Sequence, residues 1–232
     1  HGFEEVLRER MTYQRPSSYL LIRIRNYTAM TEMYDYSRLS KIHQKIAQIL
    51  RETRRRKCFY RIAASTFAVI SESSEESHEI YADLVKKLPE VWTIDGEEIV
   101  HEYSFYVVDT AKDVDNTEQL LQRVSYARSD HRGHHKPGEL IHLSNQTMEL
   151  EQEKQKVAQL VEEAILDNSI EIYFQPVYSM KKGRITSLEV LARLKDKDKN
   201  FINPEFFIHV AEENRTIIQL GEQIYRKACV FA

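Results

Sequence analysis

The chain has 232 residues, of which 42% are hydrophobic and 30% are charged, and its net charge is −3. This composition is ordinary for a soluble protein and provides no global positive field of the kind that nucleic-acid-binding proteins use. No apolar run approaches the roughly 18 residues that a membrane span needs. We therefore expect a cytoplasmic protein that binds no nucleic acid and has no membrane segment in this chain, so that any membrane tether of its parent would lie outside it.

The cysteines and the chain ends add to this picture. Cys58 and Cys229 are far apart and form no C-x-x-C pair, which is typical of a reducing compartment. The chain starts at His1 without Met or a signal sequence and stops at Ala232 inside a helical pattern. We interpret it as an excised fragment that holds one large domain or two small ones.

The hydrophobic pattern up to residue 143 alternates between helices and strands. In chain order, the expected elements are a helix over 2–13, a strand over 19–25, a helix over 34–53, strands over 58–62 and 67–71, a helix over 75–88, a strand over 99–108, a helix over 117–129 and a strand over 139–143. Leu39, Ile42 and Ile46 form the clearest helical stripe. This alternation predicts an α/β sandwich with helices on both sides of a mixed sheet.

A long helix is expected next, from a cap at Ser144 or Asn145 to about Asp167. Its second half carries an apolar stripe, whereas residues 149–156 are nearly all polar. We place the boundary between two domains in that polar half. The predicted organisation is a first domain over 1–144, a linker helix over 145–167 and a second domain over 168–232.

The first domain resembles the GGDEF family, the diguanylate cyclases, by pattern more than by motif. Residues 61–70, RIAASTFAVI, stand where the family has an Arg-x-Gly-Gly-Asp-Glu-Phe hairpin. The two glycines and two acids of that motif correspond here to Ala63, Ala64, Ser65 and Thr66. Arg23 replaces another metal-binding Asp, and Arg25 replaces the acid two residues on. Because a positive charge about 4 Å from Mg²⁺ would repel it by several kcal/mol, this domain should not be a cyclase.

Other positions also depart from the GGDEF pattern, and some residues allow more than one interpretation. The guanine-contacting Asn and Asp correspond to Thr31 and Glu32, and the product-inhibition motif R-x-x-D corresponds to Arg54 and Lys57. Arg23 and Arg25 could bind a phosphate, but ion pairs with acids such as Glu32 are favoured. The run 54–57 could bind an anion or simply end a helix. The group His131, His134 and His135 could hold a metal, but its Gly and Pro neighbours favour a surface turn.

Residues 171–194 read as a strand, a turn containing Lys181-Lys182-Gly183, and a second strand. In the second strand Glu189, Leu191 and Arg193 share one face, because side chains alternate along a strand. Burying a carboxylate and a guanidinium among apolar neighbours is costly, so this face is a candidate for a metal and a phosphate.

This segment closely resembles the opening of the EAL family, the cyclic di-GMP phosphodiesterases. The resemblance is carried by Tyr173-Phe174-Gln175-Pro176 and Glu189-Val190-Leu191-Ala192-Arg193, and it continues through 203–207, 211–213, 220–221 and 228–229. It implies that Glu189 is a metal ligand and that Gln175 and Arg193 contact the substrate, Arg193 through its phosphate. It also implies Mg²⁺ or Mn²⁺ in the full-length parent. Val190, in place of the usual Ala, lies on the opposite face and should alter only packing.

The EAL resemblance covers only the start of a TIM barrel. Such a barrel needs roughly 250 residues, and about 65 follow Asp167. In the family, the other metal ligands come from later strands, so this fragment should have no complete catalytic set and no bound metal. The expected fold class is α/β: a GGDEF-like mixed sheet flanked by helices, a linker helix, and the first strands and helices of an incomplete EAL-type barrel.

We therefore predict a cyclic di-GMP signalling protein. An inactive GGDEF module would regulate an EAL phosphodiesterase in the parent, while this chain alone would be inactive. The alternative is a non-catalytic receptor for cyclic di-GMP or another nucleotide, or a dimerisation scaffold. The apolar side chains of the barrel fragment would be stabilised by burial against another surface, so we expect a homodimer formed through residues beyond about 157.

Overall fold

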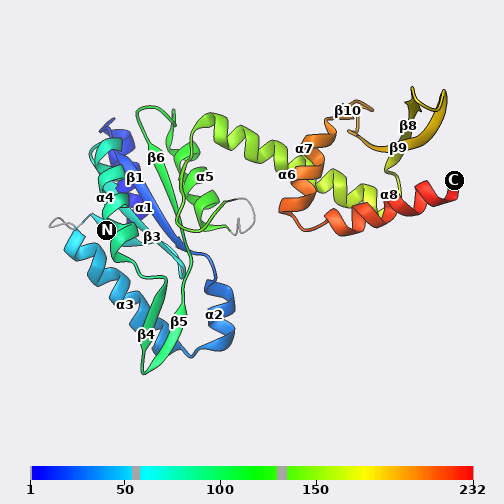
Figure 1. Ribbon diagram of the computed structural model, residues 1–232. Coiled ribbons are helices and arrows are strands. Elements are labelled where there is room, and N and C mark those ends of the chain that lie inside the picture. The colour runs from blue at the N-terminus through cyan, green and yellow to red at the C-terminus, as the bar shows by residue number, and fades with distance from the viewer. Residues whose placement is uncertain (1, 54–57, 130–134, 232) are drawn as a thin grey trace. The chain divides into compact units, whose positions relative to one another are not determined.

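The computed structural model describes residues 2–53, 58–129 and 135–231. The chain divides into two compact units, residues 1–148 and 149–232. The division falls in the polar half of the long helix α6 (Asn145–Leu166). Figure 1 shows the elements of each unit.

The first unit is built on a five-stranded sheet in the order β2-β3-β1-β6-β7. Its strands are β1 (Ser18–Ile24), β2 (Phe59–Arg61), β3 (Thr66–Ser71), β6 (Tyr103–Asp109) and β7 (Leu140–His142). Only β6 and β7 run parallel to each other, while the other neighbours are antiparallel. The sheet is therefore mixed, as the sequence predicts.

Helices cover both faces of this sheet. The covering helices are α1 (Phe3–Thr12), α3 (Tyr36–Thr53), α4 (Ser74–Lys87) and α5 (Thr117–Arg128). Leu20 and Ile22 of β1 face α3 and α4, and Tyr19 and Leu21 face α1 and α5. Because β1 is buried on both faces, it reads as a continuous apolar run in the sequence, and the predicted sandwich is confirmed.

Three features of the first unit differ from the predicted elements. Helix α2 (Tyr27–Met33) was not predicted, and neither was the hairpin of β4 (Val91–Ile94) and β5 (Glu97–Val100). Asp95 and Gly96 form its turn, both with positive φ. The single strand predicted over 99–108 is in fact β5 and β6, because residues 101 and 102 belong to no strand and the two strands pair with different partners, β4 and β1.

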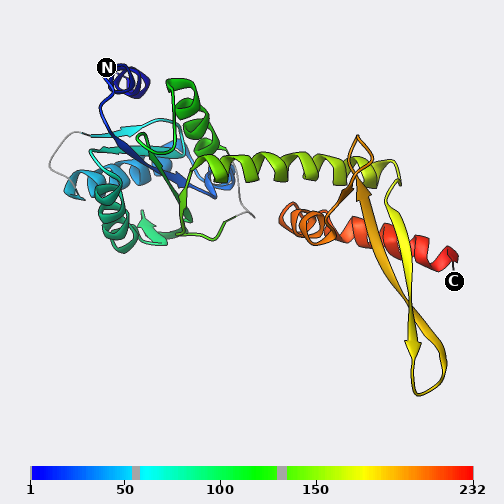
Figure 2. The ribbon, with the colours of Figure 1, turned by 90° about the horizontal axis from the view of Figure 1, so that it is seen from above.

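The second unit is a three-stranded antiparallel sheet packed on helices. After α6 come β8 (Glu171–Ser179), β9 (Arg184–Lys195), β10 (Phe201–Ile202), α7 (Pro204–Glu213) and α8 (Ile217–Phe231), with the strand order β10-β9-β8. Val157 and Val161 of α6 share a core with Ala192, Leu194 and residues of α7. The second half of the predicted linker helix is thus part of this unit's core (Figure 2).

Within the described ranges, no helix combines the length and the apolar content that crossing a membrane requires.

Candidate functional site

The β8–β9 hairpin brings the three predicted EAL-type residues onto one face. The strand register places Gln175 directly opposite Glu189, and Arg193 lies four residues further along β9. Directly opposed residues of an antiparallel pair project to the same side, with Cβ atoms about 5 Å apart. An amide, a carboxylate and a guanidinium therefore line one side of the hairpin.

The helices pack on the other side of the hairpin. Ala192 and Leu194 are buried in the core with α6 and α7. The ring of Phe174 stacks on Phe231 of α8, with 3.9 Å between the ring centroids. Because side chains alternate, Gln175 and Glu189 point away from these helices and are exposed. In a barrel with helices outside, this is the interior face. Val190 lies on the helix side.

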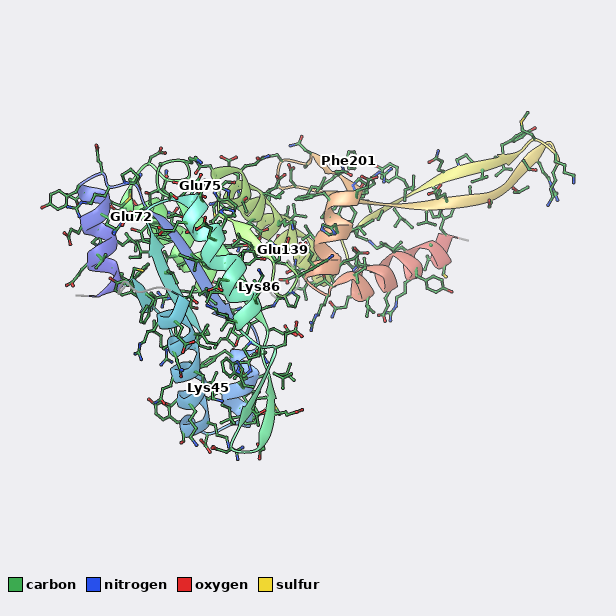
Figure 3. All side chains as sticks on the ribbon, turned by 60° about the vertical axis from the view of Figure 1, so that its left-hand side comes forward. Lys45, Glu72, Glu75, Lys86, Glu139 and Phe201 are labelled. Atoms are coloured by element: carbon green, nitrogen blue, oxygen red, sulfur yellow. The ribbon has the colours of Figure 1, made fainter. Side chains whose placement is uncertain are left out.

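Neighbouring side chains position the Arg193 guanidinium on this face. The Arg193 guanidinium lies 5.7 Å from the centroid of the Tyr173 ring, and its Nη1 donates to the carbonyl of Ala192 at 2.8 Å. Tyr173 also packs edge-on against Phe201 of β10, which Figure 3 labels. A cation–π contact of this kind holds a guanidinium without neutralising its charge, so Arg193 can still attract a phosphate.

The residues of this face do not make a metal site by themselves. Glu189 is the single carboxylate of the predicted trio, and a hard divalent cation needs about six oxygen ligands. Across the residues that the structure describes, no group of three or more His, Cys, Asp or Glu side chains could hold a metal ion. The donor set of the described residues therefore does not by itself fit Mg²⁺ or Mn²⁺, which the EAL resemblance implies for the full-length parent.

The segment that resembles a GGDEF hairpin in sequence connects β2 and β3, which pair antiparallel. The Arg61 side chain donates from Nε to the carbonyl of Ala63 at 3.2 Å and from Nη2 to that of Ala64 at 3.1 Å. The strand register sets Arg23 directly beside Thr66. The replaced positions thus lie together at one end of the sheet.

Arg23 and Arg25, which the GGDEF resemblance predicts in place of metal-binding acids, lie on β1 and directly after it. Arg23 and Arg25 are each only 6% exposed. Nη1 of Arg25 donates to the carbonyl of His135 at 2.7 Å, and its Nε lies 3.6 Å from Oε2 of Glu102. Arg25 therefore pairs with Glu102, whereas the predicted partner, Glu32, is exposed. Guanidinium groups buried here oppose a divalent cation, so this region does not fit Mg²⁺ either.

His43 of α3 lies beside this hairpin in an apolar setting. Its ring packs against Tyr27 and Phe67, and its Nε2 accepts from Nη2 of Arg61 at 3.4 Å. Burial, followed by the positive charge of Arg61, lowers the pKa of His43 from 6.5 to about 4. The folded protein therefore keeps this imidazole neutral.

Lowering the pH from 7 to 5 is expected to destabilise the first unit by about 2 kcal/mol through His43. Between its unfolded pKa of 6.5 and its folded pKa of about 4, the unfolded chain binds a proton that the folded chain does not. Stability is thus full above pH 6.5 and falls as the pH drops. Urea unfolding followed by Trp92 fluorescence at both pH values checks this, with His43→Gln as the control. An equal pH effect in both proteins would contradict it.

Some predicted sites cannot be placed, and one contact was missed. The basic run 54–57, which includes Arg54 and Lys57, lies outside the described residues, as do His131 and His134. Nε2 of His142 lies 2.7 Å from Oδ2 of the buried Asp113 and ties the loop after β6 to β7. The two residues are 29 apart in the sequence and share no periodic pattern, so the sequence did not indicate this contact.

The comparisons with known sequences agree with this geometry. Residues 158–232 match the family model described as the EAL domain. The chain is 25% identical over 199 residues to a Pseudomonas aeruginosa protein named cyclic di-GMP phosphodiesterase NbdA, covering 82% of this chain and 24% of that protein. It is 36% identical over 86 residues to the signaling protein YkoW of Bacillus subtilis, covering 37% of this chain and 10% of that protein. The chain thus spans a quarter or less of these relatives.

Two solved structures are similar in fold. The GGDEF domain of a Pseudomonas aeruginosa protein named TpbB or YfiN has a TM-score of 0.53 at 14% identity, covering 64% of this chain and 89% of that one. Vibrio cholerae LapD, comprising an S helix, GGDEF and EAL and bound to c-di-GMP, has a TM-score of 0.52 at 14% identity, covering 99% of this chain and 56% of that one. These matches confirm the predicted fold class.

Proposed function

We propose that this chain is part of a cyclic di-GMP phosphodiesterase whose second unit is the beginning of an EAL barrel. The observation that supports this most is the EAL match over 158–232 together with the placement of Gln175, Glu189 and Arg193 on the face opposite α6, α7 and α8. In this proposal Glu189 binds metal, and Gln175 and Arg193 hold the phosphodiester. The proposal places the other metal ligands on further strands, as the EAL resemblance implies, and Glu189 alone does not complete the site. The test is the effect of Glu189→Gln on hydrolysis.

The first unit would serve as a regulatory module without cyclase activity. We expect the purified chain to form no cyclic di-GMP from GTP with Mg²⁺ or Mn²⁺, because guanidinium groups replace the carboxylates that would hold the metal. Chromatographic product analysis checks this, with an active diguanylate cyclase as the positive control. Measurable product from the purified chain would refute it.

A second candidate is a non-catalytic receptor for cyclic di-GMP or another nucleotide, or a scaffold. It shares with the first candidate the lack of a complete metal-binding group in the described ranges, and it differs from that candidate in having no metal ligands on the later strands. Isothermal titration with cyclic di-GMP, together with a hydrolysis assay on the complete protein, separates the two candidates. Binding without turnover in the presence of Mn²⁺ would select the receptor.

The second unit is expected to form a homodimer. Large apolar side chains are exposed on it, and β8 is an edge strand of its sheet: the exposed side chains include Leu166, Tyr173, Ile218, Tyr225 and Val230. Burying such side chains and pairing an open edge both favour association. Light scattering at micromolar concentration should give twice the chain mass of 27.4 kDa. A monomeric mass with residues 171–231 protected from hydrogen exchange would instead indicate that the first unit buries these apolar side chains.

A further inference from the structure

The outer half of the β8–β9 hairpin, residues 177–188, is called the hairpin tip below. In Figure 2 and Figure 3 the tip extends away from the helices of its own unit. All of its charged side chains are basic: Lys181, Lys182 and Arg184. The flanking acids are Glu171 and Glu189, and Glu189 is five residues from Arg184, or about 17 Å along an extended strand.

The same tip exposes apolar and aromatic side chains. Met180 is 89% exposed, Ile185 is 57% exposed and Tyr178 is 56% exposed. The turn that presents them is well ordered: the Gly183 N–H donates to the Ser179 carbonyl at 2.8 Å, and Gly183 has a φ of +62°, which a side chain would disfavour. Apolar and basic groups are therefore held at one protruding end.

We propose that the hairpin tip docks onto an anionic lipid surface. Lysine and arginine heads would contact lipid phosphates while Met180, Tyr178 and Ile185 enter the boundary between headgroups and acyl chains. The net charge of the whole chain is −3, but the Debye length at physiological salt is about 8 Å. Salt therefore screens the charge of acids about 17 Å away. A membrane at the tip would be attracted by the three positive charges of Lys181, Lys182 and Arg184.

The shape of the tip favours a lipid surface over an acidic peptide. A cavity of about 930 Å³ lies elsewhere, against Ile165, Phe174 and Phe231, and the open edge of β8 ends at Ser179, before the turn that carries Met180, Lys181 and Lys182. A protruding tip can instead insert into a planar, deformable interface. The tip contains none of the three predicted site residues, so substitutions in the tip leave Gln175, Glu189 and Arg193 unchanged.

The test is co-sedimentation of the chain with vesicles of phosphatidylcholine alone and with about 30% phosphatidylglycerol, at low and physiological salt. The protein should bind only the anionic vesicles, and salt should weaken binding. K181E/K182E/R184E should lower the partition coefficient at least 100-fold, because each basic group near such a surface contributes about fivefold. M180S/I185S should lower it about tenfold, because two apolar side chains no longer insert.

The matched control is K156E/K197E/K199E, which reverses three exposed basic side chains elsewhere in the second unit and changes the net charge equally. It should keep most of the binding, and all variants should retain the wild-type circular dichroism. Equal loss in the control, or no loss in the tip variants, would overturn the proposal. Binding to soluble polyglutamate that M180S/I185S leaves unchanged, with no vesicle binding, would assign the tip to an acidic macromolecule instead.

Discussion

Replacing Glu189 by Gln is expected to abolish metal-dependent hydrolysis of cyclic di-GMP by the complete protein, with a rate loss of about 1,000-fold or more. The amide keeps the size of the side chain but removes the negative charge that would bind a divalent ion. Metal ions supply several kcal/mol of transition-state stabilisation, and each 1.36 kcal/mol corresponds to a factor of ten. The substitution should not unfold the protein, because Glu189 is exposed on the helix-free side of β9.

A matched control for this substitution is Glu222→Gln, which makes the same chemical change at an exposed position on α8. Its rate should stay within about twofold of the wild type, because the side chain lies on a helix and not on the face of Gln175 and Glu189. Initial rates measured by loss of cyclic di-GMP with Mn²⁺ present give the comparison. Hydrolysis by Glu189→Gln near the wild-type rate would show that Glu189 is not a ligand.

Elements with a strong periodic signal could be predicted from the sequence. Leu39, Ile42 and Ile46 predicted α3, and all three are buried in the core. Asn203 and Pro204 are helix start signals that the sequence also carries, and the Asn203 side chain does cap α7.

Short or conflicting segments could not be predicted. Helix α2 has seven residues and a single buried one, Met30, so it has no apolar stripe. The β4–β5 hairpin did carry a signal, Asp95-Gly96 between alternating residues, which was overlooked. The predicted strand over 99–108 joined two strands that belong to different sheets, because β5 pairs with β4 whereas β6 pairs with β1.

The candidate site could be predicted because its residues lie on one hairpin, where alternation and register determine the facing side chains. Partnerships across long sequence separations could not. Arg25 pairs with Glu102 and not with Glu32, because β6 lies beside β1 in the sheet, which no local pattern shows. The buried group of Lys154 and Glu151 on α6 and Glu213 on α7 was missed for the same reason.

Removing the ammonium group of Lys154 is expected to destabilise the second unit by about 3–5 kcal/mol. Its Nζ lies 2.9 Å from Oε1 of Glu213 on α7 and 3.9 Å from Oε1 of Glu151, and all three side chains are largely buried. Lys154→Met removes the buried cation from this group, and removing one partner of a buried ion pair costs this much. Glu213 keeps the exposed His209, whose Nε2 lies 3.1 Å from its Oε1. Hydrogen exchange of residues 204–231 in increasing urea follows this unit, since the single Trp lies in the other one.

The double variant K154M/E213L separates two quantities: the net contribution of the ion pair to the free energy of unfolding, and the destabilisation that follows from removing only one partner. Apolar replacement of a whole buried pair is often neutral, so the double variant should recover most of the loss. Lys156→Met, two residues away and exposed, should stay within about 0.5 kcal/mol of the wild type. If Lys154→Met were no more destabilising than Lys156→Met, the ion pair would not hold α6 on α7, and the apolar contacts of Val157 and Val161 would be sufficient for that packing.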